Sequence, residues 1–157
     1  MPVADMLVIF GAKYLIALSV LVFLLYVLYA PSVVRRRLFA LAALALPLAY
    51  GVAKTVSLLY YNARPFVVEN STPLVAHVAD NGFPSDHTLL ATALASVVLV
   101  YSRPVGLLLW ALALCVGVSR VLADVHHVVD IAASAAIAGM VVGGVYVLVR
   151  TREWYTR

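Results

Sequence analysis

Long apolar runs alternate with short polar connections along the chain, and five of these runs approach or reach the length that crosses a bilayer. A spanning helix needs roughly 20 mostly apolar residues. Between the second and third runs, residues 61–84 contain Pro, Asn and Gly and are predicted to form a loop, with a short surface helix at 73–79 (PLVAHVA). The five runs cover residues 3–30, 38–60, 85–101, 105–123 and 126–149.

This pattern predicts an all-α integral membrane protein, a compact bundle of five transmembrane helices with residues 1–157 in a single domain. Composition supports this class, because 65% of the residues are hydrophobic, 11% are charged and the mean hydropathy is +1.05. A soluble domain of this length could not cover so much apolar surface with so few charges. The net charge of +4 does not indicate nucleic-acid binding, because most arginines stand at the ends of apolar runs.

The arginines also predict an orientation. Positive charges concentrate in cytoplasmic loops, so the side that carries most arginines is predicted to be cytoplasmic. The 61–84 loop and the turn near residue 124 then lie on the extracytoplasmic side of a plasma membrane. In a topology of five spans, the arginines on the cytoplasmic side are Arg35, Arg36, Arg37, Arg103, Arg150, Arg152 and Arg157.

Polar residues from three separated segments are predicted to meet at the extracytoplasmic face. Ionisable residues in or near spans are costly and are interpreted as functional. Lys54, Arg64 and Arg120 would repel one another in a low-dielectric pocket unless an anion neutralised them. A phosphate fits this requirement, because Arg holds it bidentately and Lys holds it as a point charge. Helices that start near Ser85 and near residues 124–126 would point free N–H groups to the same side.

A histidine and an aspartate supply a candidate nucleophile and its partner. His126 and Asp130 are four residues apart and are predicted to share a helix face, so that the carboxylate fixes the imidazole tautomer. The other ring nitrogen could attack phosphorus, and His87 from another helix could protonate the departing oxygen. The set predicts a two-step phosphoryl transfer through a phosphohistidine, with the cations stabilising the transferred group and with no metal or other cofactor.

Some of these residues also have other interpretations. Arg120 and Asp124 are spaced i, i+4, so a plain salt bridge is an alternative to phosphate binding. A metal site made of His126, His127 and Asp124 is a weaker alternative, because adjacent His side chains diverge. Three glycines of the last run, Gly139, Gly143 and Gly144, indicate close helix packing. The residues predicted to be structural or interfacial are Lys13, His77 and His127.

Two of the polar segments resemble elements in the signature of the type-2 phosphatidic acid phosphatase superfamily. The signature element Ser-Arg-x5-His-x3-Asp is matched completely by Ser119-Arg120, His126 and Asp130. The element Pro-Ser-Gly-His is matched by residues 84–87, with Asp86 in place of the glycine.

The remaining element, Lys-x6-Arg-Pro, is matched only in part. Arg64-Pro65 fit it, but nine residues instead of six separate Lys54 from Arg64, and strict spacing puts Ser57 at the lysine position. Lys54 and Ser57 are one helical turn apart, so the long side chain of Lys54 could still reach the site. The motif core therefore covers residues 54–130.

The stretch ARPF…DNGFPSDHT is most similar to the undecaprenyl-diphosphatase branch, of the bacitracin-resistance type. That branch implies removal of the terminal phosphate from undecaprenyl diphosphate, to leave undecaprenyl phosphate, at the outer face of a bacterial plasma membrane. The family usually has six spans, one more than the five counted here. The resemblance implies His126 as nucleophile, Asp130 as its orienting partner, His87 as general acid, and phosphate binding by Lys54, Arg64, Ser85, Arg120 and the backbone at Asp86.

Two other functions remain open on the sequence alone. The same fold could act on another lipid phosphate, such as phosphatidylglycerophosphate, a lipid A phosphate or diacylglycerol pyrophosphate, because headgroup size depends on the 61–84 loop. A small transporter or channel could instead use the cations as an anion site. A transporter would tolerate His126→Gln better than Arg120→Ala, because it needs charge rather than a nucleophile.

Overall fold

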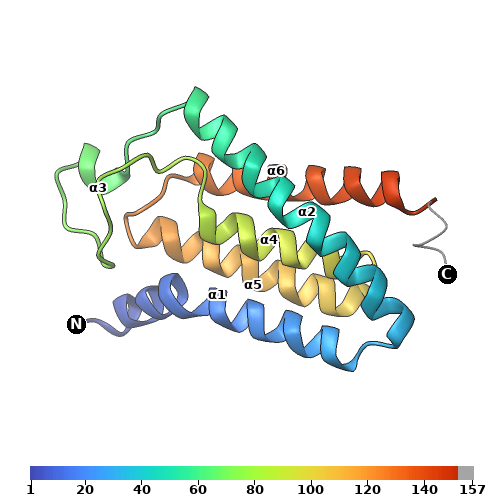
Figure 1. Cartoon of the computed structure of the whole chain (residues 1–157). Coiled ribbons are helices and arrows are strands. Elements are labelled where there is room, and N and C mark those ends of the chain that lie inside the picture. Colours follow the sequence, from blue (N-terminus) through green and yellow to red (C-terminus); the bar gives the residue numbers. More distant parts are fainter. Residues whose placement is uncertain (152–157) are drawn as a thin grey trace.

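The structure is a computed structural model that describes residues 1–151, and every regular element in this range is a helix (Figure 1). The β-type pairing in the same range is a single isolated bridge between Ala63 and Asn81. The predicted all-α bundle is confirmed. The helices are α1 (Val3–Tyr29), α2 (Ser32–Leu59), α3 (Pro65–Val68), α4 (Asp86–Leu99), α5 (Arg103–Leu122) and α6 (Val128–Val149).

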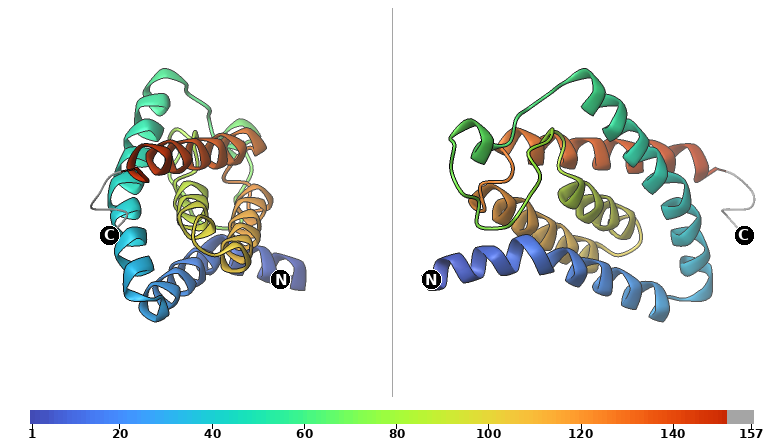
Figure 2. Two further views of the ribbon diagram at one scale, coloured as in Figure 1. Left: turned by 90° about the vertical axis from the view of Figure 1, so that its right-hand side faces the viewer. Right: turned by 60° about the vertical axis from the view of Figure 1, so that its left-hand side comes forward.

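Helix α4 lies in the middle of the bundle, with α1, α2, α5 and α6 around it (Figure 2). It is buried over most of its length, as expected of a helix that is apolar on all sides. The hydroxyl groups of Thr92 and Ser96 do not oppose this burial, because they bond to the helix's own backbone. Thr92 Oγ1 donates to Thr88 O at 2.6 Å, and Ser96 Oγ donates to Thr92 O at 2.7 Å.

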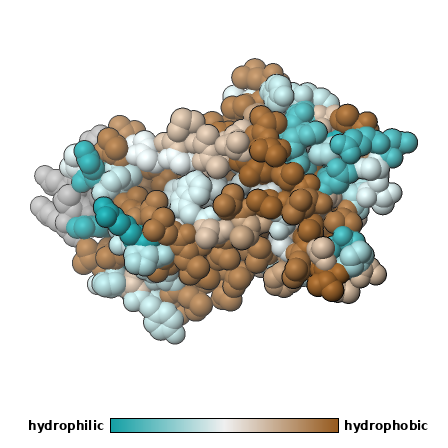
Figure 3. Space-filling model, turned by 180° about the vertical axis from the view of Figure 1, so that it is seen from behind, coloured by the Kyte–Doolittle hydropathy of each residue, from teal (hydrophilic) through white to brown (hydrophobic). Residues whose placement is uncertain are grey.

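Four helices, α1, α2, α5 and α6, are long and apolar enough to cross a membrane. Helix α4 has 14 residues, and a rise of about 1.5 Å per residue makes it about 21 Å long, shorter than the roughly 30 Å hydrocarbon core. The third predicted span is therefore a shorter apolar helix enclosed by the others. Hydrophobic side chains cover the middle of the face in Figure 3 and hydrophilic ones gather at its ends, as in a multi-pass membrane protein.

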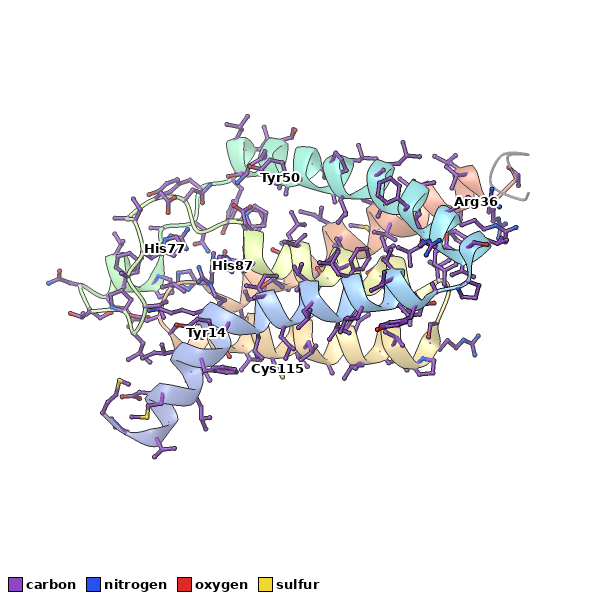
Figure 4. All side chains as sticks on the ribbon, turned by 60° about the horizontal axis from the view of Figure 1, so that its bottom comes forward. Tyr14, Arg36, Tyr50, His77, His87 and Cys115 are labelled. Carbon is purple, nitrogen blue, oxygen red and sulfur yellow. The ribbon has the colours of Figure 1, made fainter. Side chains whose placement is uncertain are left out.

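The candidate site and the arginine-rich connections lie at opposite ends of the bundle. The 61–84 loop and the α5–α6 turn share one end, and the α1–α2 and α4–α5 connections share the other (Figure 1). Figure 4 shows His77 and His87 at the first end and Arg36 at the second. Because α2 begins at Ser32, the arginine triplet 35–37 lies in its first turns rather than in a loop. Arg152 and Arg157 lie outside the described residues.

The short surface helix predicted at residues 73–79 is wrong. This segment is irregular, and a single short helix, α3, forms earlier in the loop, with Pro65 at its first position. The Leu74 N–H donates to Ala123 O at 3.2 Å, and Val75 is buried in a cluster with Ala123. Contacts with the α5–α6 turn therefore decide the conformation of this segment.

Close helix approaches occur at glycines other than those predicted. A Cβ on Gly106 would collide with the backbone of Leu99, so the start of α5 lies directly against the end of α4. A Cβ on Gly11 would collide with the Ser119 side chain, so α1 packs closely on α5. The prediction of close packing in α6 is wrong, because its glycines point into open space. These are Gly139, Gly143 and Gly144.

Candidate active site

His126 and Asp130 contact each other at the turn between α5 and α6. His126 Nδ1 lies 3.3 Å from Asp130 Oδ2, and both side chains are buried. Because an ionised carboxylate only accepts hydrogen bonds, Nδ1 carries the proton and Nε2 keeps its lone pair. The carboxylate accepts two further bonds, from Asn62 Nδ2 and from the His127 N–H, each at 2.8 Å. Three donors therefore fix its orientation.

The predicted shared helix face of this pair is wrong in detail. Helix α6 begins at Val128 with His127 as its N-cap, so His126 precedes the helix. The pair still meets, because Asp130 is the third helical residue and its side chain reaches back to the cap in a capping box. The ring of His127 points elsewhere, with Nε2 3.1 Å from Ala63 O.

Arg64 stands against the free nitrogen of His126. Its Nη1 lies 3.3 Å from His126 Nε2 and donates to Val125 O at 2.8 Å. Its Nε donates to Asp80 Oδ1 at 2.7 Å. The Arg64 side chain is only 6% exposed, whereas Asp80 is 56% exposed, so a surface carboxylate holds one edge of a buried guanidinium.

Arg120, in the last turn of α5, is buried without being fully hydrogen-bonded. The residue is 4% exposed, and its Nε and Nη2 have no acceptor within residues 1–151. The charge of Arg120 is close enough to interact with His126, and the charge of Arg64 is close enough to interact with Arg120. Buried guanidinium N–H groups without acceptors are costly, so this environment favours an anion beside the three side chains.

Asp124 does not supply that anion. No salt bridge joins it to Arg120 in the described part of the chain, so this predicted alternative is wrong. The reason is local: Asp124 has a φ of 65°, and its carboxylate accepts a hydrogen bond from Ser71 Oγ. Across residues 1–151, no cluster of three or more His, Cys, Asp or Glu is placed to hold a metal ion, so the weaker metal alternative has no support.

The start of α4 brings Ser85 and His87 to the same place. Ser85 is the buried N-cap of the helix, and its carbonyl accepts from Ser134 Oγ of α6 at 2.9 Å. This bond fixes the first turn of α4 against α6. His87, in that turn, is close enough to Arg120 and His126 for their charges to act on it.

Lys54 lies at the rim of this group and pairs with Asp86. Its Nζ is 3.1 and 3.0 Å from the two carboxylate oxygens, and both side chains are about half exposed. The aspartate that replaces the signature glycine therefore faces a cation. Ser57, at the strict lysine position, instead accepts from Asn81 Nδ2 through its carbonyl at 3.0 Å.

The surroundings of His126 favour a neutral imidazole. Burial lowers its pKa below the ordinary 6.5, the bond to Asp130 opposes this shift, and the charges of Arg64 and Arg120 add to it. Burial alone would raise the pKa of the Asp80 carboxyl. The Arg64 guanidinium has the larger effect and holds the pKa of Asp80 below its ordinary value. At neutral pH the site therefore presents one neutral ring nitrogen beside two guanidinium cations.

Residues of the 61–84 loop complete the site, and no motif in the sequence indicated that they belong to it. Asn81 closes the loop, because its side chain donates to Tyr60 O and accepts from the Asn62 and Phe83 N–H groups at 2.9 to 3.0 Å. The Asn-Gly pair at 81–82 signals a turn, but a turn signal does not identify the partners of the side chain. The loop residues in question are Asn62, His77, Asp80 and Asn81.

An apolar cavity of about 230 Å³ borders the site between α2 and α4. It extends along α4 from Asp86, next to His87, to Ala93 nearly two turns away. An apolar chain attached to a group bound beside His126 could occupy it. The lining residues are Leu46, Ala49, Tyr50, Asp86, Leu89, Leu90 and Ala93.

Comparison with known proteins identifies one family. The model of the PAP2 superfamily matches residues 36–154. The bacitracin transport permease protein BcrC of Bacillus licheniformis is 32% identical over 126 residues, which cover 79% of this chain and 60% of that protein. The undecaprenyl-diphosphatase BcrC of Bacillus subtilis (strain 168) is 37% identical over 83 residues, which cover 53% of this chain and 43% of that protein. The matches thus cover less than two thirds of either relative. No solved structure matches the chain at a significant level.

Proposed function

Because the chain belongs to the PAP2 superfamily, we propose that it is a metal-independent membrane phosphatase that removes the terminal phosphate of a polyprenyl diphosphate. Undecaprenyl diphosphate is the substrate suggested by the name of the Bacillus subtilis relative. The observation that carries the proposal is the buried guanidinium of Arg120, with two nitrogens, Nε and Nη2, lacking acceptors, close to Arg64 and His126. The several oxygens of a phosphate satisfy such donors and neutralise both guanidinium groups.

In the first step, His126 Nε2 attacks the terminal phosphorus. The bond from phosphorus to the bridging oxygen breaks, and His87 gives its proton to the departing lipid monophosphate. Before the substrate binds, Arg64 Nη1 lies 3.3 Å from His126 Nε2. When the substrate binds, the Nη1 N–H donates a hydrogen bond to a phosphate oxygen instead, and Arg120 binds another phosphate oxygen. Asp130 keeps the proton on Nδ1 and stabilises the positive charge that forms on the ring.

The second step returns the enzyme to its initial state. His87, now without its proton, takes a proton from water, and the water oxygen attacks the phosphorus of the phosphohistidine. The phosphorus–nitrogen bond breaks, its electron pair returns to His126 Nε2, and inorganic phosphate leaves. The Ser85 hydroxyl and the free N–H groups at the start of α4, including that of Asp86, bind the remaining oxygens in both steps.

The polyprenyl chain occupies the apolar cavity between α2 and α4. This placement is supported by the cavity's position, because it begins at Asp86, next to His87, and its walls are apolar. The Lys54–Asp86 pair stands at the same place, where Lys54 can bind the phosphate that stays on the lipid. The site faces the extracytoplasmic side of a bacterial plasma membrane, because the arginine-rich connections lie at the opposite end of the bundle.

Phosphate release from a panel of lipids tests this proposal. The purified full-length chain, in one detergent with excess EDTA, is given polyprenyl diphosphate, polyprenyl monophosphate, phosphatidylglycerophosphate, a lipid A phosphate and diacylglycerol pyrophosphate. We expect the highest kcat/KM with polyprenyl diphosphate. A preference for another of these lipids would replace the proposed substrate and keep the reaction, whereas no release from any of them would contradict the proposal.

The acid limb of the pH–rate profile is expected below pH 6.5. Protonated His126 has no lone pair to attack phosphorus, and its pKa lies below 6.5 because of burial and the neighbouring guanidinium groups. The acid-side decline in kcat/KM for a short-chain, water-soluble polyprenyl diphosphate should therefore have its midpoint below pH 6.5. A half-maximal rate above pH 7 on the acid side would show that His126 is not neutral in the free enzyme.

Replacing Asp86 by Gly is expected to leave the enzyme active and to change its substrate preference. The exposed Lys54–Asp86 pair contributes little to stability, but its loss frees the Lys54 ammonium and removes a negative charge beside the phosphate site. The measurement is kcat/KM for polyprenyl diphosphate relative to the monophosphate, with Asp86→Asn as the matched variant that removes charge alone. Complete loss of turnover in a folded Asp86→Gly protein would contradict this role.

A further inference from the structure

His77 belongs to none of the signature elements, yet it lies at the site. Its ring centroid is 6.3 Å from that of His126, with the two ring planes at 75°. It lies at the same end of the bundle as His87 (Figure 4), close enough for the protonation of one ring to affect the other. At this centroid distance the rings of His77 and His126 are near enough for both to touch the same phosphate group. The prediction of a structural or interfacial role did not place His77 at the site.

The chain holds His77 in this place from both sides. Two residues before it, Val75 is 2% exposed and packs in a cluster with Ala123 and Val125 of the α5–α6 turn. Three residues after it, Asp80 is bonded to the buried Arg64. The segment that carries the ring is thus fixed at its ends to the same turn and the same arginine that form the site.

The proton of neutral His77 can be located from its partner. Nδ1 lies 3.3 Å from Val78 O, and a carbonyl only accepts, so Nδ1 carries the proton and Nε2 has a lone pair. Burial lowers the pKa of His77, the charges of Arg64 and Arg120 lower it further, and Val78 O and Asp80 act against them. Without an anion in the site, His77 is therefore neutral at pH 7 and offers an acceptor.

We propose that His77 is a phosphate-binding residue that shares one proton with a non-bridging oxygen of the substrate's terminal phosphate; this rests on the proposed function. A phosphate group loses its last proton near pH 6 to 7, so the monoanion brings a P–OH group that His77 Nε2 can accept from or deprotonate. A hydrogen bond forms between that oxygen and Nε2, its proton lies between the two atoms, and no other bond changes.

The proposal predicts a specific dependence of phosphate affinity on pH. Affinity for inorganic phosphate should fall as the pH rises and the shared proton is lost. The other groups that face His77 are Arg64 and Asp80 of the loop, Arg120 of α5, His126 of the α5–α6 turn and His87 of α4. Those groups are the same in a His77 variant, so the difference between the two proteins isolates His77.

Direct binding of inorganic phosphate to the full-length chain in detergent provides the test, by calorimetry from about pH 5.5 to about pH 8.5. His77→Ala should bind phosphate about tenfold more weakly at the lower pH and should raise KM with kcat changed less than about threefold. His77→Gln, whose amide donates at any pH, should retain most of the affinity and lose most of the pH dependence. Thr72→Ala, at an exposed position of the same loop, is the matched control and should behave as the unaltered chain.

Two outcomes would overturn the proposal. Unchanged pH dependence of phosphate affinity in His77→Gln would show that no proton is shared at this position. A loss of kcat and of thermal stability in both variants, with phosphate affinity unchanged, would show a structural role alone. Because phosphate binding is measured without turnover, an inactive chain would contradict the proposed function while leaving this test intact.

Discussion

Replacing His126 by Ala is expected to lower phosphate release from polyprenyl diphosphate by about 10⁴-fold or more. In the proposed mechanism Nε2 of this residue forms the bond to phosphorus, and the adjacent ring of His127 is turned away to Ala63 O. The measurement is kcat of the purified variant and of the unaltered chain in the same detergent with EDTA. Near-normal turnover by the variant would end the phosphohistidine mechanism.

Two companion variants make this result specific. His127→Ala removes the adjacent ring and should keep turnover within about tenfold, because that ring contacts Ala63 O and is not the proposed nucleophile. His126→Gln and Arg120→Ala separate an enzyme from an anion transporter. A phosphatase loses turnover in either variant. A transporter would keep its anion flux in His126→Gln and lose it in Arg120→Ala.

Replacing Asp130 by Asn is expected to lower kcat by about 10³- to 10⁴-fold. Three donors converge on the carboxylate, from His126 Nδ1, Asn62 Nδ2 and the His127 N–H. An amide has one acceptor oxygen, so its NH₂ group would face at least one of these donors. The imidazole can then carry its proton on Nε2, which leaves the attacking nitrogen without a lone pair.

The same substitution should also cost about 1–3 kcal/mol of stability, because a buried donor is left without an acceptor. Kinetics and thermal unfolding are therefore measured on the same preparation. Asp124→Asn is the matched control, because it makes the same chemical change in the same turn. Asp124 has a φ of 65°, which Asn tolerates well, and its Ser71 bond needs only one acceptor. Near-normal kcat in Asp130→Asn would mean that the tautomer of His126 does not matter.

Hydrophobic periodicity was sufficient to predict the bundle, and it failed where tertiary contacts override local pattern. The apolar runs predicted the long helices within a few residues at most ends, because burial in a bilayer requires continuous apolar helices. The 73–79 segment has an apolar pattern as well, but Val75 is buried against the α5–α6 turn and the segment does not form a helix. Such contacts join residues far apart in the chain, and periodicity contains no information about them.

The part of the site that could be predicted is the part in which spacing along the chain brings two residues into contact. Asp130 does reach His126 from four residues away, although through a capping box instead of a shared helix face. The partners contributed by the loop were not predictable, because Asn62 reaches Asp130 and Asp80 reaches Arg64 only through the fold of an irregular loop. The glycines of α6 were also predicted wrongly from local pattern, because small residues permit close helix packing without requiring it.

Capture of the covalent intermediate tests the central claim most directly. The full-length chain is mixed with polyprenyl diphosphate labelled in its terminal phosphate, the reaction is stopped with base, and the labelled peptide is sequenced by mass spectrometry. The mechanism predicts label on His126, stable in base and lost in acid, and no label in His126→Ala. Label on another residue, or turnover by the unaltered chain with no covalent label under conditions that preserve phosphohistidine, would contradict it.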